Sequence, residues 1–175
     1  MSDGLGIFSR STLMRFAPLF IGRKPRATLI RSVILIVSAF VVFGWLLIPM
    51  RLSGISMEPT YHDGAFNFAN RAAYWFHAPT RGDVVAIRMA GPRVMYVKRI
   101  IAMPGERIEI VNGTVLINGI ALAEPTVVRR ARWNRAVVTV GPDEYFVVGD
   151  NRSMRIENHE MGQVSRARIV GRMLF

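Results

Sequence analysis

The run of 19 residues from Ser32 to Met50, SVILIVSAFVVFGWLLIPM, contains no charged side chain. As an α-helix it would be roughly 28 Å long at about 1.5 Å per residue. That length is close to the ~30 Å hydrocarbon core of a bilayer. Trp45 and Pro49 near its C-terminal end fit an interfacial aromatic residue and a helix stop. The run predicts a single transmembrane helix over residues 32–50.

Two other interpretations of this run are a cleavable signal peptide and a buried helix of a soluble protein. The run is longer than the usual apolar part of a signal peptide, and the following Pro-Met-Arg-Leu-Ser lacks a small-x-small cleavage pattern. A buried helix without a polar face needs a larger protein around it. We therefore expect a permanent membrane anchor.

The charges around the run predict its direction. Residues 1–31 hold six of the 23 basic residues and one of the 12 acidic residues, and four of those six closely precede Ser32: Arg23, Lys24, Arg26 and Arg31. Basic flanks stay on the cytoplasmic side of a membrane. We expect a basic cytoplasmic segment (1–31), a transmembrane anchor (32–50) and an export-side domain (51–175).

Composition excludes several other functions. The net charge of +11 comes partly from the N-terminal segment, and no motif of interleaved aromatic and basic residues accompanies it, so no nucleic-acid partner is predicted. The absence of cysteine excludes disulfides, thiolate zinc sites and a cysteine nucleophile. The lipid bilayer is an expected partner, whereas no metal or cofactor is expected and the oligomeric state stays open.

The chain from residue 81 onward has the patterns of β-strands. Two Asn-Gly pairs, at 112–113 and 118–119, separate alternating apolar runs and predict tight hairpins. The fold class is therefore mainly β, with packed antiparallel sheets, a possible short helix at 67–76 and an exposed loop at 123–135. The expected strands are 83–89, 94–103, 107–111, 114–117, 120–122, 137–140, 144–148 and 168–175.

Ser56 is the first candidate for chemistry. It lies six residues beyond the predicted anchor, between Gly54 and Pro59, which favour a constrained, exposed turn. Taken alone, a serine in such a place is most often just part of a loop.

Lys98 is the second candidate. Only two lysines occur, Lys24 and Lys98, and the second stands in an apolar strand with Tyr96 on the same face. Such a lysine often extends to the edge of the sheet. A third candidate segment, Gly149-Asp150-Asn151-Arg152, follows an apolar strand and by itself indicates only a turn.

The order of these segments resembles the type I signal peptidases, which are serine proteases with a Ser/Lys dyad. The similarity runs from about Gly54 to Arg172, behind the predicted anchor. It rests on Ser-Met-x-Pro-Thr at 56–60, Arg-Gly-Asp-Val-Val at 81–85, Tyr-Val-Lys-Arg-Ile at 96–100, Pro-Gly-Glu at 104–106 and Gly-Asp-Asn-Arg at 149–152.

The resemblance implies that Ser56 is the nucleophile, Lys98 the general base and signal-peptide-bearing precursors the partners. It implies that residues 51–175 form the catalytic domain of a bacterial inner-membrane protein. It also implies that Met57 lines the site and that Arg99 pairs with Asp150. A serine needs a base, and His62, His77 and His159 stand in no triad signature. A lysine is a base only when neutral, which burial and nearby positive charge favour.

Two departures from the family pattern concern the support of this dyad. Gly54 stands where some members have an oxyanion-binding serine, which leaves the Ser56 N–H as the surer donor. Arg155 stands where a serine usually contacts the lysine, and Ser153 is the candidate substitute. Glu157 and His159 are the candidates for the usual acid–base pair after the turn.

Three alternatives stay open from the sequence. A conjugation-type pilin maturation peptidase shares the dyad and the fold. A self-cleaving repressor of the SOS type would need a DNA-binding domain in place of the anchor. A membrane-tethered β-domain that binds peptides would have no enzymatic activity.

Overall fold

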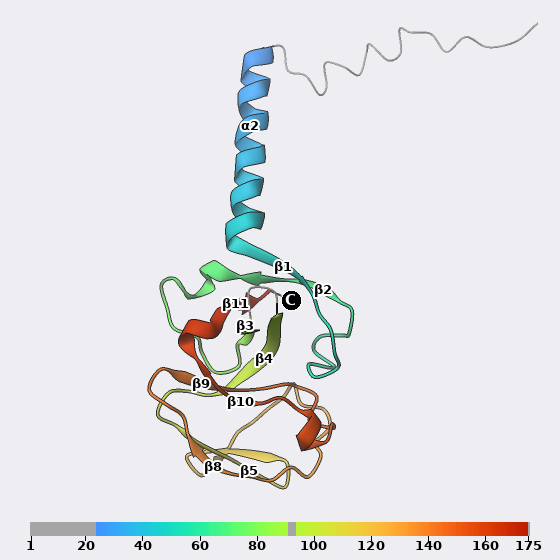
Figure 1. The fold of residues 1–175 in the computed structure, drawn as a ribbon, viewed down its shortest axis with the longest axis vertical. Coiled ribbons are helices and arrows are strands. Elements are labelled where there is room, and N and C mark those ends of the chain that lie inside the picture. The colour runs from blue at the N-terminus through green and yellow to red at the C-terminus, as the bar shows by residue number, and fades with distance from the viewer. Residues whose placement is uncertain (1–23, 91–93, 175) are drawn as a thin grey trace, which may run out of the picture. The chain divides into compact units, whose positions relative to one another are not determined.

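The computed structural model describes residues 24–90 and 94–174, so residues 1–23 of the expected basic segment lie outside it. The described chain is mainly β, with one long apolar helix near the N-terminus (Figure 1). Its described residues fall into two compact units, one within positions 1–44 and the other within positions 45–175. The prediction of a mainly β fold of antiparallel sheets behind an apolar helix is confirmed.

Helix α2 spans Pro25–Val41 and continues as a π-helical segment, Val42–Leu46. Pro25 stands at the start of the helix, where a missing N–H costs no intrahelical bond. The 22 residues have a hydropathy of 2.3 and are long and apolar enough to cross a membrane, judged by length and composition. The helix begins before Ser32 and ends before Met50, so it is displaced from the expected range of 32–50. Residues 47–50 belong to strand β1 (Leu47–Arg51), and a short apolar run in a strand cannot be distinguished from one in a helix by its composition.

Two antiparallel sheets form the second unit. The larger has the order β1-β2-β11-β3-β4-β9-β10, and the smaller has the order β7-β6-β5-β8. Three short 3₁₀ helices lie at Arg71–Tyr74, Ile156–Asn158 and Arg166–Arg168. The strands are β1 (Leu47–Arg51), β2 (Phe66–Asn70), β3 (Val84–Ala90), β4 (Val94–Ala102), β5 (Arg107–Val111), β6 (Thr114–Ile117), β7 (Ile120–Ala121), β8 (Arg135–Thr139), β9 (Glu144–Val148), β10 (Gly162–Ser165) and β11 (Ile169–Met173).

The two predicted Asn-Gly hairpins are confirmed. Asn112-Gly113 joins β5 to β6 and Asn118-Gly119 joins β6 to β7, and all four residues have positive φ. Both central positions of a type I′ turn require this conformation. The turns therefore fix the register of β5, β6 and β7 in the small sheet.

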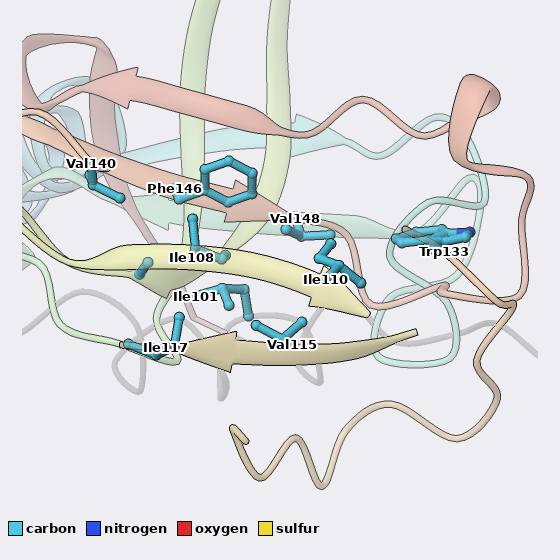
Figure 2. Close-up of a cluster of buried hydrophobic side chains, with 10 residues drawn as sticks. Ile101, Ile108, Ile110, Val115, Ile117, Trp133, Val140, Phe146 and Val148 are labelled. Atoms are coloured by element: carbon cyan, nitrogen blue, oxygen red, sulfur yellow. The ribbon is translucent and has the colours of Figure 1, made fainter. Parts of the chain in front are cut away.

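One core cluster joins the two sheets. Figure 2 shows Phe146 and Val148 of β9 facing Ile108 and Ile110 of β5, with Trp133 at one end. Strand β4 pairs with β3 on one side and β9 on the other, so it lies inside the large sheet. This central place makes β4 a rigid support for the side chains that it carries.

Three strands were missed and two other expectations need correction. The strands β1, β2 and β10 were not predicted, and residues 67–70 of the expected helix belong to strand β2. In β2 the exposed and buried positions do not follow polarity, because Phe66 is exposed whereas Asn67 is buried. The loop at 123–135 is not uniformly exposed, because Glu124 and Trp133 are buried.

Candidate active site

The loop between β1 and β2 carries Ser56. Gly54 has φ of +99°, a conformation that favours glycine, and its N–H donates to Asp63 Oδ1 at 2.8 Å. Leu52 and Met57 are buried in a cluster with residues of β2, β3 and β11. The chain is thus anchored on both sides of Ser56, whose own side chain stays partly exposed.

Lys98 of β4 contacts this serine. Its Nζ donates to Ser56 Oγ at 2.9 Å, and only 4% of the residue is exposed. Burial lowers the pKa of Lys98, while the nearby Glu160 acts in the opposite direction. The structure therefore joins the two residues that the sequence named as candidates, although they are 42 positions apart.

The turn at 149–152 packs against the Ser56 loop. Asn151 N–H donates to the Ser56 carbonyl at 3.0 Å, and Asn151 Nδ2 donates to the Ile55 carbonyl at 2.9 Å. A Cβ at position 149 would lie 2.2 Å from Ser56 O, so the close approach requires Gly149.

Arg99 and Asp150 form the expected pair. Arg99 Nε and Nη2 donate to the two carboxylate oxygens of Asp150 at 2.8 and 2.6 Å. Thr60, from the Ser56 segment, donates to the same carboxylate at 2.5 Å. Lys98 and Arg99 engage different groups, as expected for successive residues of a strand.

An open cavity of about 930 Å³ surrounds Ser56 and Lys98. Tyr96 lines it, as does Glu160, and the Tyr96 hydroxyl donates to Glu160 Oε1 at 2.9 Å. This hydrogen bond raises the pKa of Tyr96. Most of the remaining side chains of the lining are apolar: Ile48, Pro49, Met50, Leu52, Ile55, Met57, Met95, Val97 and Met154.

Ser153 does not take the place of the serine that the family pattern puts beside the lysine. Its hydroxyl donates to Asn151 Oδ1 at 2.6 Å. Arg155, which occupies the position of that serine, is exposed and pairs with Glu157 at 3.2 Å.

The expected acid–base pair of Glu157 and His159 is not formed. His159 is buried, its ring lies 4.7 Å from that of Trp133, and its Nε2 accepts from Gly149 N–H at 2.9 Å. Burial, followed by the positive charges of Lys98 and Arg152, lowers the pKa of His159 to about 3. His159 is therefore neutral and holds the 149–152 turn through its hydrogen bond with Gly149.

Three residues of this region were missed from the sequence: Glu160, Glu124 and Asn151 as a contact of the serine loop. Glu124 pairs with the buried Arg152 at 2.5 Å and with Arg130 at 3.0 Å. No motif marks Glu160 or Glu124, because Glu160 contacts Tyr96, 64 positions away, and Glu124 contacts the buried Arg152, 28 positions away. The sequence placed Asn151 in the Gly-Asp-Asn-Arg segment of the family pattern but did not predict its contact with Ser56.

The arrangement can perform acyl transfer. It offers a hydroxyl, a buried amine in contact with it and an open cavity with a mostly apolar lining. Among residues 24–90 and 94–174, no group of three His, Cys, Asp or Glu residues is placed to hold a metal ion. The fold and this site define a serine-type peptidase.

Comparisons with known proteins identify the family within that class. The family described as signal peptidase, peptidase S26, matches residues 26–175, so the chain belongs to the signal peptidase family. Signal peptidase I of Bacillus amyloliquefaciens is 34% identical over 82% of this chain and 80% of its own. Signal peptidase I T of Bacillus subtilis is 32% identical over the same shares.

A solved structure is also similar. The crystal structure of a signal peptidase I from Enterococcus faecalis has 27% sequence identity and a TM-score of 0.44, covering 55% of this chain and 97% of its own.

Proposed function

We propose that this protein is a membrane-anchored endopeptidase that removes signal peptides from exported precursors, with Ser56 as nucleophile and Lys98 as general base. The observation that carries the proposal is the 2.9 Å contact between Lys98 Nζ and Ser56 Oγ beside an apolar cavity. The names of the relatives, signal peptidase I, support the substrate class.

In the acylation step, neutral Lys98 takes the proton of Ser56 as Oγ attacks the scissile carbonyl carbon. The negative oxygen that forms is stabilised by the N–H of Ser56. Lys98 then gives its proton to the leaving amine, which becomes the N-terminus of the mature protein, and the signal peptide stays esterified to Ser56. In the second step Lys98 activates a water that hydrolyses this ester.

The buried position of Lys98 supports its role as a base. At an ordinary pKa of about 10.4, about one lysine in a thousand is neutral near pH 7.5. Burial disfavours the charged form and so raises this fraction. The apolar lining around Met57 and Val97 supports uncharged substrate residues next to the cleaved bond, and membership of the signal peptidase family supports small ones.

The apolar helix supports an anchored enzyme, and Arg26 and Arg31 beside Lys24 support a cytoplasmic N-terminus. On this proposal, residues 51–175 act on the outer side of a bacterial inner membrane, where precursors arrive. No observation favours a conjugation-type pilin peptidase or a non-enzymatic binding domain.

The test is incubation of the detergent-purified full chain with a Sec-type precursor, followed by N-terminal sequencing of the product. We expect one cut after a small residue, with another small residue two positions upstream. Absence of cleavage, or efficient cleavage after large or charged residues, would contradict the proposal.

A further inference from the structure

We propose that Asn151 is a positioning residue that orients the backbone N–H of Ser56 towards the negative oxygen of the transition state. This inference rests on the proposed function of Ser56. It concerns how the nucleophile loop is held, which neither the Ser56–Lys98 contact nor family membership specifies.

Asn151 binds two successive carbonyls of the nucleophile loop. Its side-chain Nδ2 donates to Ile55 O at 2.9 Å, and its backbone N–H donates to Ser56 O at 3.0 Å. The Ile55 carbonyl also accepts from Glu58 N–H at 3.2 Å. Both peptide groups that contain Ser56 atoms are therefore held from the side of the 149–152 turn.

The hold on Ile55 O determines the direction of the Ser56 N–H. The peptide bond between Ile55 and Ser56 is planar and trans, since the cis bond of this loop is Glu58–Pro59. In a trans peptide the C=O and the N–H point in opposite directions. When Asn151 fixes the Ile55 carbonyl on one side, the Ser56 N–H must point to the other.

The Ser56 N–H is available for this use. Within the described residues it donates no hydrogen bond to the protein, whereas the N–H of Gly54 is occupied by Asp63 Oδ1 at 2.8 Å. Gly54 also has no side chain that could supply a second donor. Correct orientation of the Ser56 N–H thus carries more weight here than in a site with a serine at position 54.

Asn151 is itself fixed in place. Its Oδ1 accepts from Ser153 Oγ at 2.6 Å and from Ser153 N–H at 3.3 Å, which assigns the acceptor and donor ends of the amide. The preceding residues are held too, because Asp150 is bound by Arg99 and Gly149 N–H donates to His159. The donor is therefore held in position before a substrate arrives.

A donor that acts on developing charge affects the transition state more than the bound substrate. Removal of a direct oxyanion donor lowers kcat by about 10²–10³-fold. For loss of a residue that orients such a donor, we expect kcat to fall by about 10–100-fold with KM changed less than about threefold.

The test compares the detergent-purified full chain with Asn151→Ala and with Asn151→Asp, which keeps the shape and the acceptor for Ser153 but loses the donor to Ile55 O. Three readouts are measured: kcat and KM, affinity for a peptide aldehyde, and affinity for the same peptide with an N-methylated scissile bond. The aldehyde forms a tetrahedral adduct with the serine, whereas the methylated peptide reports binding of the ground state.

We expect both variants to lose kcat and aldehyde affinity by similar factors, with affinity for the methylated peptide unchanged. The matched control is Asn134→Ala, which removes a similar hydrogen bond, from Asn112 N–H to Asn134 Oδ1 at 2.9 Å, outside the cavity. If Asn151→Ala does not fold by circular dichroism, the isosteric Asn151→Asp variant decides.

The outcomes separate this inference from the proposed function. If the parent chain neither cleaves precursor nor binds the aldehyde, the proposed function is wrong. If the parent is active but the folded Asn151 variants retain kcat within twofold, the inference is wrong. It is also wrong if kcat falls while aldehyde affinity stays unchanged, or if affinity for both ligands falls equally.

Discussion

Arg99 and Asp150 form a two-point ion pair that ties the central strand β4 to the turn beside the nucleophile. Their side chains are 15% and 1% exposed, and the two nitrogen–oxygen distances are 2.8 and 2.6 Å. Arg99 also donates to Gly82 O at 2.6 Å. The pair therefore fixes the position of the 149–152 turn relative to the strand that carries Lys98.

Asp150→Ala is expected to lower stability and activity together. Removing one partner of a buried pair leaves the other charge without compensation, which costs about 3–5 kcal/mol. Denaturant unfolding and precursor cleavage measure the two effects. The control is Glu157→Ala, which breaks the exposed pair with Arg155 and should cost no more than about 1 kcal/mol. An Asp150→Ala chain with full stability and activity would show that the pair has no structural role.

His159 is expected to make the protein less stable at acid pH. Its folded-state pKa is about 3, against 6.5 for an ordinary histidine, because of burial and nearby positive charge. Between these values the unfolded chain binds a proton that the folded chain does not, so stability falls as pH drops through 6.5 towards 3. His159→Gln keeps an acceptor for Gly149 N–H but does not titrate. Thermal unfolding from pH 7 to pH 4 should be less pH-dependent in this variant, and an unchanged slope would refute the assignment.

Glu160 is expected to set the pH at which activity appears. Its negative charge raises the pKa of Lys98 against the larger effect of burial. Other polar groups near the Lys98 amine include the Ser56 hydroxyl, the Tyr96 phenol and the neutral His159, and Asn158 lines the same cavity. Glu160→Gln removes a charge that favours the ammonium, so more Lys98 is neutral and the rise in kcat should move to lower pH.

The control for this shift is Glu109→Gln, which removes an acidic residue from β5 of the small sheet. Its kcat–pH profile should match that of the parent. A Glu160→Gln profile that is unchanged, or displaced to higher pH, would mean that the carboxylate does not act on the base.

The proposed orientation predicts the result of reporter fusions. Fusions after Phe76 or Arg135 should be active only when the reporter works on the export side, because the basic residues cluster before Ser32. Cytoplasmic reporter activity at both positions would reverse the topology and remove access to exported precursors.

Local patterns were sufficient to predict most of the fold. Local sequence determines the β-branched strands β3 and β4 and the two Asn-Gly turns, because these features depend on residues close together in the chain. The structure contains all of them. Strand β2 escaped prediction because its burial depends on tertiary packing, with Asn67 inside and Phe66 outside. The helix was predicted to continue to Met50, because residues 47–50 are as apolar as the helix before them. In the structure these residues form strand β1.

The candidate pair Ser56 and Lys98 was found because each residue lies in a short motif. The order of these motifs along the chain matches the order in the signal peptidase family. Tyr96 was predicted on the same strand face as the lysine, whereas Glu160 beside them was not predicted. Glu160 approaches Tyr96 from a segment 64 positions away, and the loop that carries it is held by contacts such as Trp133 Nε1–H to Met154 O at 2.8 Å. Such contacts follow from the packing of distant segments, so the replacement of the family serine by Arg155 could not be interpreted from the sequence.

The most direct test of the central claim is precursor cleavage by Lys98→Arg, with circular dichroism of the same preparation. Arginine keeps the positive charge but does not lose a proton in a protein. We predict a folded and almost inactive chain, Ser56→Ala equally inactive, and a double variant no worse than either, because the members of a catalytic unit are not additive. Appreciable turnover by folded Lys98→Arg would contradict Lys98 as the base and would require another group to activate Ser56.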